Sequence, residues 1–163
     1  IYRMSGGSSP AAQAIASTYY YDLGANELFE ADTGQPSPIA APSRATQADG
    51  SPAGVTAYVY SCGSCASKEE IYVGYLEQMS KEGREALAQL KAASPDIRWE
   101  DVPPSGRRGM TVNPDESMLV ARESLEDGWV SRESPEGAAI MEEARARCGE
   151  GRVPTSCKPS DIK

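Results

Sequence analysis

Residues 55–65 read VTAYVYSCGSC, and the other elements of the fold can be placed around this stretch. Its first six residues are β-branched or aromatic apart from one alanine, which is typical of a strand. The strand runs directly into Cys62 and Cys65, and a second pair, Cys148 and Cys157, lies near the C-terminus. Thiols this close in sequence can converge on one point, so the pattern indicates a metal site, a pair of disulfides or a redox couple.

A structural zinc site is the interpretation that the sequence slightly favours. A tight turn at Gly63 brings two thiolates together, and the later pair completes a closed tetrahedral site. Zinc is therefore the expected cofactor, although zinc ribbons usually carry a second CxxC and here eight residues separate the later cysteines. The expected metal ligands are Cys62, Cys65, Cys148 and Cys157.

Two structural disulfides are the second interpretation of the same four thiols. An even number of cysteines fits it, and an oxidising location outside the cytoplasm would favour it. Bridges from the middle of the chain to its C-terminal tail would close loops of roughly ninety residues, which is worth on the order of 4 kcal/mol in the chain-entropy model.

A thioredoxin-like thiol–disulfide oxidoreductase is the third interpretation. A strand, a CxxC and a helix follow one another, as they do in that fold, and a helix N-terminus would lower the pKa of the first thiol. Cys62 would then attack the substrate and Cys65 would resolve the mixed disulfide. Against this interpretation, Cys65 precedes the expected helix, and no convincing proline loop follows.

The composition describes a domain with a modest core. The chain has 163 residues, 39% of them hydrophobic, with 12 prolines and 15 glycines. Such a chain forms one domain with long ordered loops, and a covalent or metal cross-link would stabilise it. The proline-rich segment 34–54 is expected to be an extended surface segment.

Charge and the absence of histidine exclude several classes of function. The net charge is −8, and there is no basic stripe to neutralise phosphates, which argues against nucleic-acid binding. The chain has no histidine, which excludes a Ser-His or Cys-His nucleophile pair and a His-ligated catalytic zinc.

The remaining patterns predict an α+β domain. Residues 18–30 and 118–130 are each expected to form a β-hairpin that joins strand 55–61 in a small antiparallel sheet. Residues 68–92 are expected to be helical, with a break at Ser80, because a capping-box pattern precedes apolar residues at helical spacing. A second helix is expected over 135–148. The expected helices cover one face, and the four-cysteine cluster cross-links the domain.

The first residues are expected to be a spacer. Residues 1–17 are rich in serine, glycine and alanine, and we expect them to be either an ordinary N-terminal tail or the spacer after a membrane anchor. Residues 18–163 are expected to form a single domain.

Several short motifs point to one group of proteins. These are the tyrosine-rich segment 19–23 with its partner 27–29, residues 57–65 with the CxxC, and the motifs at 74–77 and 134–137. Together they resemble a group of uncharacterised bacterial proteins with one N-terminal membrane span and a small soluble domain. The resemblance implies a membrane-anchored domain outside the cytoplasm, and it supplies no catalytic residue.

These observations favour a non-enzymatic structural or interaction domain, tethered to a membrane and stabilised by its four cysteines. The expected partner is a protein, for which segment 34–54 and the exposed aromatic side chains are candidate surfaces. The membrane would be contacted only through a preceding span.

Overall fold

The computed structural model describes residues 16–32, 36–98, 101–102 and 112–163. These residues form one antiparallel sheet with two α-helices, so the expected α+β class is confirmed. Most of the expected spacer, residues 1–15, lies outside the described residues. In spatial order the strands are β2 (Glu27–Asp32), β1 (Ser17–Asp22), β3 (Gly54–Ser61), β4 (Ile71–Met79), β5 (Met118–Ala121) and β6 (Val130–Ser131), and β7 (Thr155–Ser156) pairs with β3.

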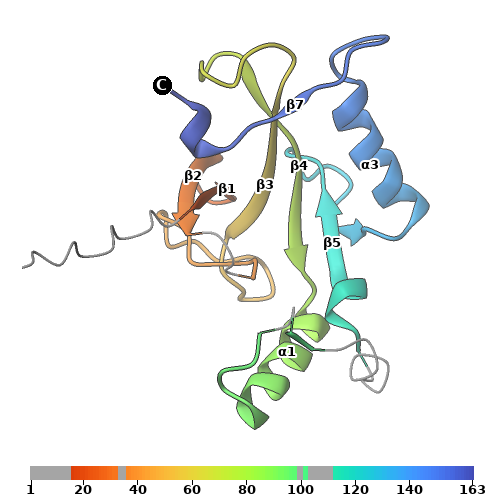
Figure 1. Ribbon diagram of the computed structural model, residues 1–163. Helices are drawn as coiled ribbons and strands as arrows, with labels where there is room; N and C mark the ends of the chain where they lie inside the picture. The colour runs from red at the N-terminus through yellow and green to blue at the C-terminus, as the bar shows by residue number, and fades with distance from the viewer. Residues whose placement is uncertain (1–15, 33–35, 99–100, 103–111) are drawn as a thin grey trace, which may run out of the picture.

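The two faces of the sheet pack against different partners. On one face, Tyr75 and Val120 contact Ile140 and Ala144 of α3 (Pro135–Ala146), which lies along the sheet in Figure 1. The other face carries the larger core cluster, and neither α-helix of the described residues packs on it. That cluster consists of Tyr19, Tyr21, Val55, Ala57, Val59, Val73, Leu76 and Cys157.

The expected helix over 68–92 is wrong in its first half, because residues 71–79 form the central strand β4. β4 pairs with β3 on one side and β5 on the other, and both of its faces are buried. A register shift opposite Tyr58 and Val59 changes the alternation, so that Tyr72 and Tyr75 both lie on the α3 side. Because β4 is buried on both faces and its alternation is interrupted, its apolar residues follow one another at a spacing like that of a helix.

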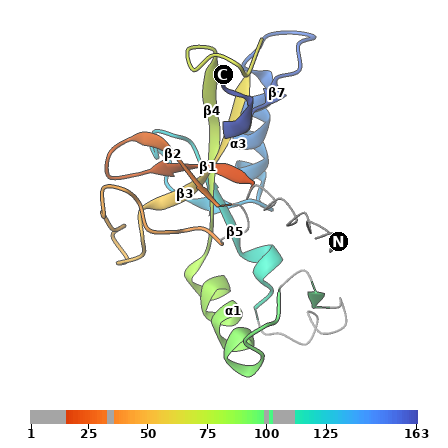
Figure 2. The same ribbon diagram turned by 60° about the vertical axis from the view of Figure 1, so that its left-hand side comes forward.

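The expected break at Ser80 is where the helix actually begins. The Ser80 side chain accepts a hydrogen bond from the Gly83 N–H at 3.1 Å, and α1 (Lys81–Ala93) follows. Figures 1 and 2 show that α1 extends away from the end of β4. The expectation that both helices cover one face is therefore wrong, since α3 alone does so.

The first hairpin is confirmed and is held by a buried carboxylate. Asp22 is 2% exposed and accepts hydrogen bonds from the N–H groups of Gly24 and Ala25 and from both the N–H and the hydroxyl of Ser43. Figure 2 shows the β1–β2 hairpin crossing the direction of β4, so the sheet is strongly twisted. We call the face opposite α3 the concave face, because a groove lined by residues of β1, β2 and β4 lies on it.

Candidate functional site

The four cysteines form two disulfides, Cys62–Cys148 and Cys65–Cys157. Their Cα–Cα distances are 5.3 Å and 5.4 Å, which lie within the ordinary range. Both bridges tie the turn after β3 to the C-terminal segment, and β7 adds two residues to the edge of β3 at the same place. The sequence identified the four residues that meet but left their chemistry and pairing open.

The zinc interpretation is wrong. All four expected ligands are consumed by the disulfides, so no thiolate is available to a metal. Among the described residues, no group of three or more cysteine, aspartate or glutamate side chains is arranged to hold a metal ion. The four-cysteine cluster is thus a pair of covalent bridges.

The pairing also departs from a thioredoxin-like centre. A CxxC redox couple cycles by forming a bond between its own two thiols. Here Cys62 and Cys65 are bonded to different partners about ninety residues away. The first residues after Cys65 form turns, and strand β4 follows, so no helix N-terminus faces Cys62.

The disulfides place the C-terminal segment against the concave face. After Cys157, the short 3-10 helix η3 (Pro159–Asp161) packs beside β1, and Ile162 contacts the core cluster. Arg152 donates a hydrogen bond to the Cys62 carbonyl at 2.7 Å and fixes the intervening loop. The last residues of the chain thereby become one wall of a groove.

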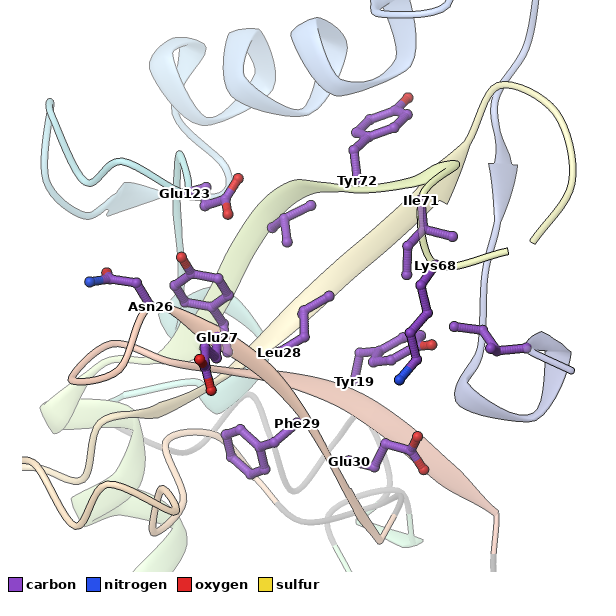
Figure 3. Close-up of a pocket in the computed structure, with 13 residues that line it drawn as sticks. Tyr19, Asn26, Glu27, Leu28, Phe29, Glu30, Lys68, Ile71, Tyr72 and Glu123 are labelled. Carbon is purple, nitrogen blue, oxygen red and sulfur yellow. The ribbon is translucent and has the colours of Figure 1, made fainter. Parts of the chain in front are cut away.

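A groove with a volume of about 740 Å³ lies on the concave face and is the candidate binding site (Figure 3). We call it the concave groove. β1 and β2 form one side, and β4 with the turn before it forms the other. Its lining residues are Tyr19, Tyr21, Asn26, Glu27, Leu28, Phe29, Glu30, Lys68, Ile71, Tyr72, Val73, Glu123 and Ile162.

The strand register explains which side chains meet on this face. Tyr21 lies opposite Leu28, and Tyr19 lies opposite Glu30, so these four share one face of the hairpin. The remaining apolar part of the groove comes from Ile71 and other residues of β4 and the C-terminal segment. The sequence already carried this signal as a period of two in the hairpin, but the contribution of β4 was hidden by its helix-like pattern.

The rim of the groove is mainly acidic. Glu27, Glu30 and Glu123 are exposed there, against the single cation Lys68. Burial, and then the charge and hydrogen bond of Glu123, raise the pKa of Tyr21 to about 12. Tyr21 is therefore neutral at physiological pH, and its hydroxyl donates a hydrogen bond to the Glu123 carboxylate.

Tyr19 lies at the end of the groove where Lys68 and Glu30 also lie (Figure 3). Its side chain is buried, and its hydroxyl has no hydrogen-bond partner among the described residues. Burial, with added effects of Glu30 and Asp161, raises the pKa of Tyr19, so its hydroxyl is also neutral.

The opposite face has a polar network that is fully paired. Buried Glu77 accepts hydrogen bonds from the Tyr58 hydroxyl at 2.9 Å and from Arg132 at 3.0 Å. Tyr72 donates to the Ala144 carbonyl at 3.0 Å and so fixes α3 to β4. These groups bind one another and leave no vacant polar position for a ligand.

The proline-rich segment is partly built into the fold. Ser37 is buried, and its hydroxyl donates to the Glu77 carbonyl and accepts from the Thr56 N–H. The Ser37 carbonyl accepts from the Met79 N–H. This end of the segment therefore joins β3 to the end of β4, which is a structural role that its composition did not indicate.

The described helices include none that is both long and apolar enough to cross a bilayer. The chain matches no family model, and no curated protein or solved structure is significantly similar to it.

Proposed function

We propose that this chain is a non-catalytic, disulfide-stabilised binding domain whose concave groove holds part of a partner protein. The observation that carries the proposal is the groove itself. An open apolar floor with an acidic rim lies on the sheet face that neither described α-helix covers. Concave, mostly apolar surfaces with a few polar groups are the usual form of binding sites.

The disulfides support a location in an oxidising compartment. Bridges of this kind persist outside the cytoplasm and are reduced within it. Together with the resemblance to anchored bacterial proteins, they support a domain displayed on the outer side of a membrane and tethered there. In this setting the bridges keep the C-terminal wall of the groove in place without a large core.

The test is selection of binders from a random peptide library displayed on phage, with the oxidised protein as the target. Selected peptides are then tested on Leu28→Lys, which places a charge in the apolar floor, and on Val153→Lys. Val153 is 88% exposed and is not a groove residue, so it is the matched control. Glu123→Trp is a second blocking variant at an exposed rim position, and circular dichroism checks that each variant is folded.

The proposal predicts that the selected peptides lose binding to Leu28→Lys and Glu123→Trp and keep it for Val153→Lys. Peptides that bind all three variants equally would place the site elsewhere and contradict it. Failure to select any peptide above background would also count against it.

A further inference from the structure

Among the described residues, the Tyr19 hydroxyl is the one buried side-chain polar atom that lacks a hydrogen-bond partner. Tyr19 is only 6% exposed, and its hydroxyl makes no hydrogen bond there. The other two tyrosines that line the groove differ: the Tyr21 hydroxyl bonds to Glu123, and the Tyr72 hydroxyl bonds to the Ala144 carbonyl on the α3 side of the sheet. A buried hydroxyl without a partner destabilises the free protein, so its position at the end of a groove indicates that a ligand supplies the bond.

Two carboxylates define the sign of the charge that this position accepts. Glu30 lies directly opposite Tyr19 in the β1–β2 ladder, and Asp161 comes from η3, which packs beside β1. Both are exposed, and both act electrostatically on the Tyr19 hydroxyl. A cationic group is attracted by both carboxylates, and its N–H can donate to the phenolic oxygen. An anion would be repelled by both.

We propose that the Tyr19 end of the concave groove binds the ammonium or guanidinium group of a lysine or arginine in an extended segment of a partner protein. This inference rests on the groove being the binding site proposed above. The remaining acidic rim and apolar floor match a segment in which basic and aliphatic side chains alternate.

The size and the edge of the groove favour a peptide over a free amine. A volume of about 740 Å³ is far larger than one ammonium group requires. β2 is the first strand of the sheet, and in the described part of the chain only β1 pairs with it. Its outer backbone groups are thus available to an added strand, whose alternate side chains would point toward the groove.

Lys68 distinguishes a cation site from an anion site. In Figure 3 its side chain extends from the turn before β4 toward Tyr19 and Glu30. Its ammonium makes no ion pair with Glu30 or Asp161 in the described chain. A cationic ligand would have to displace Lys68, so removing this side chain should strengthen binding, whereas an anionic ligand would use Lys68 and lose affinity.

The experiment measures affinity by isothermal titration calorimetry with three octapeptides, in which leucine alternates with lysine, glutamine or glutamate. The variants are Tyr19→Phe, Glu30→Gln and Lys68→Ala. Glu85→Gln and Lys91→Ala are the controls, because they make the same charge changes at exposed positions on α1, away from the groove. They measure how much of the attraction reflects only the net charge of −8.

We expect the lysine peptide to bind most tightly. Its affinity should fall about fivefold in Tyr19→Phe and in Glu30→Gln, rise in Lys68→Ala, and stay nearly constant in the two controls. Equal changes in Glu30→Gln and Glu85→Gln would reduce the effect to general attraction and overturn the inference. Tighter binding of the glutamate peptide, or weaker binding to Lys68→Ala, would overturn it in favour of an anion.

Further outcomes separate this inference from the proposed function. If the glutamine peptide binds as well as the lysine peptide and Leu28→Lys abolishes both, the groove binds peptides but the cation subsite is wrong. If Leu28→Lys abolishes the binding of neither peptide, the groove is not the binding site and the proposed function is wrong. If spermidine competes at the same concentration as the lysine peptide, the ligand of the groove would be a free amine and not a segment of a partner protein. If sedimentation shows dimers, the bound partner would be a second copy of this chain.

Discussion

Each disulfide closes a long loop, yet removing either one alone should lower the free energy of unfolding by only about 2.8 kcal/mol. The bridges span 86 and 92 residues, and one such loop alone reduces the entropy of the unfolded chain by about 4.6 kcal/mol in the chain-entropy model. Once one bridge is present, the other no longer closes that loop. Positions 62 and 65 are three apart, and 148 and 157 are nine apart, so the second bridge closes a ring of roughly 12 residues.

The perturbation is therefore a set of three variants. Cys62→Ala/Cys148→Ala and Cys65→Ala/Cys157→Ala each remove one bridge, and the remaining two cysteines can pair in only one way. The fourfold alanine variant removes both bridges. Its free energy of unfolding should fall by about 7.4 kcal/mol, which is more than twice the decrease expected for either single bridge. Because natural domains are stable by about 5–15 kcal/mol, this variant should be largely unfolded at 25 °C.

The assay is equilibrium urea unfolding followed by circular dichroism, with the oxidation state checked by mass spectrometry. The m-value should increase as bridges are removed, since the unfolded chain then exposes more surface. Single losses near 4.6 kcal/mol that simply add in the fourfold variant would refute the shared-loop reasoning. A fourfold variant as stable as the oxidised protein would refute the structural role of the bridges.

Three further changes follow from buried polar groups. Tyr19→Phe should raise the free energy of unfolding by about 1 kcal/mol in urea, because it removes a buried hydroxyl without a partner; a loss of stability would mean that the hydroxyl is bonded. Arg132→Ala should cost about 3 kcal/mol, because it leaves the buried Glu77 carboxylate without its cation, and Arg132→Met/Glu77→Met should restore most of it; equal losses in both variants would contradict this. For Asp22, burial raises the pKa, but the hydrogen bonds from Ser43 and the hairpin backbone outweigh this effect and lower the pKa. The stabilisation by Asp22 is therefore complete above the unfolded-state pKa of about 4, and it is lost as the pH falls through the lower folded-state pKa. Asp22→Asn should therefore be less stable at pH 7 and lose less stability than the parent between pH 5 and pH 2 in thermal melts; parallel pH profiles would refute the assignment.

Local signals in the sequence predicted much of the fold. The alternating hairpin of β1 and β2, the aromatic strand β3 and the Ser134 cap of α3 are all encoded within a few residues. Ser134 accepts a hydrogen bond from the Gly137 N–H at 3.0 Å and caps the helix that was expected over 135–148. Such features depend on neighbouring residues and need no knowledge of the tertiary structure.

The errors came from residues whose environment is set by distant parts of the chain. Strand β4 is apolar on both faces because β3 and β5 flank it and α3 covers one side, so its sequence lacks alternation. Gly74 of β4 also depends on a distant residue, since a Cβ at this position would lie 2.6 Å from the ring of Tyr60 in β3. The pairing of the cysteines depends likewise on where the C-terminal segment returns.

The candidate site was recoverable only in part. The alternation of Tyr19 with Tyr21 and of Leu28 with Glu30 placed these side chains on a common face. Lys68 and Ile162 come to the same groove through the turn before β4 and through the disulfide-linked tail, and nothing local in the sequence indicates this.

Chemical-shift mapping of the ¹⁵N-labelled oxidised protein, titrated with the leucine–lysine octapeptide, shows directly whether the concave groove binds a peptide. We expect saturable shifts in the amides of Tyr19, Leu28, Glu30 and Ile71, with the amides of α3 unchanged. Shifts that spread over the acidic surface without saturating, or that centre on α3, would contradict a binding groove on the concave face.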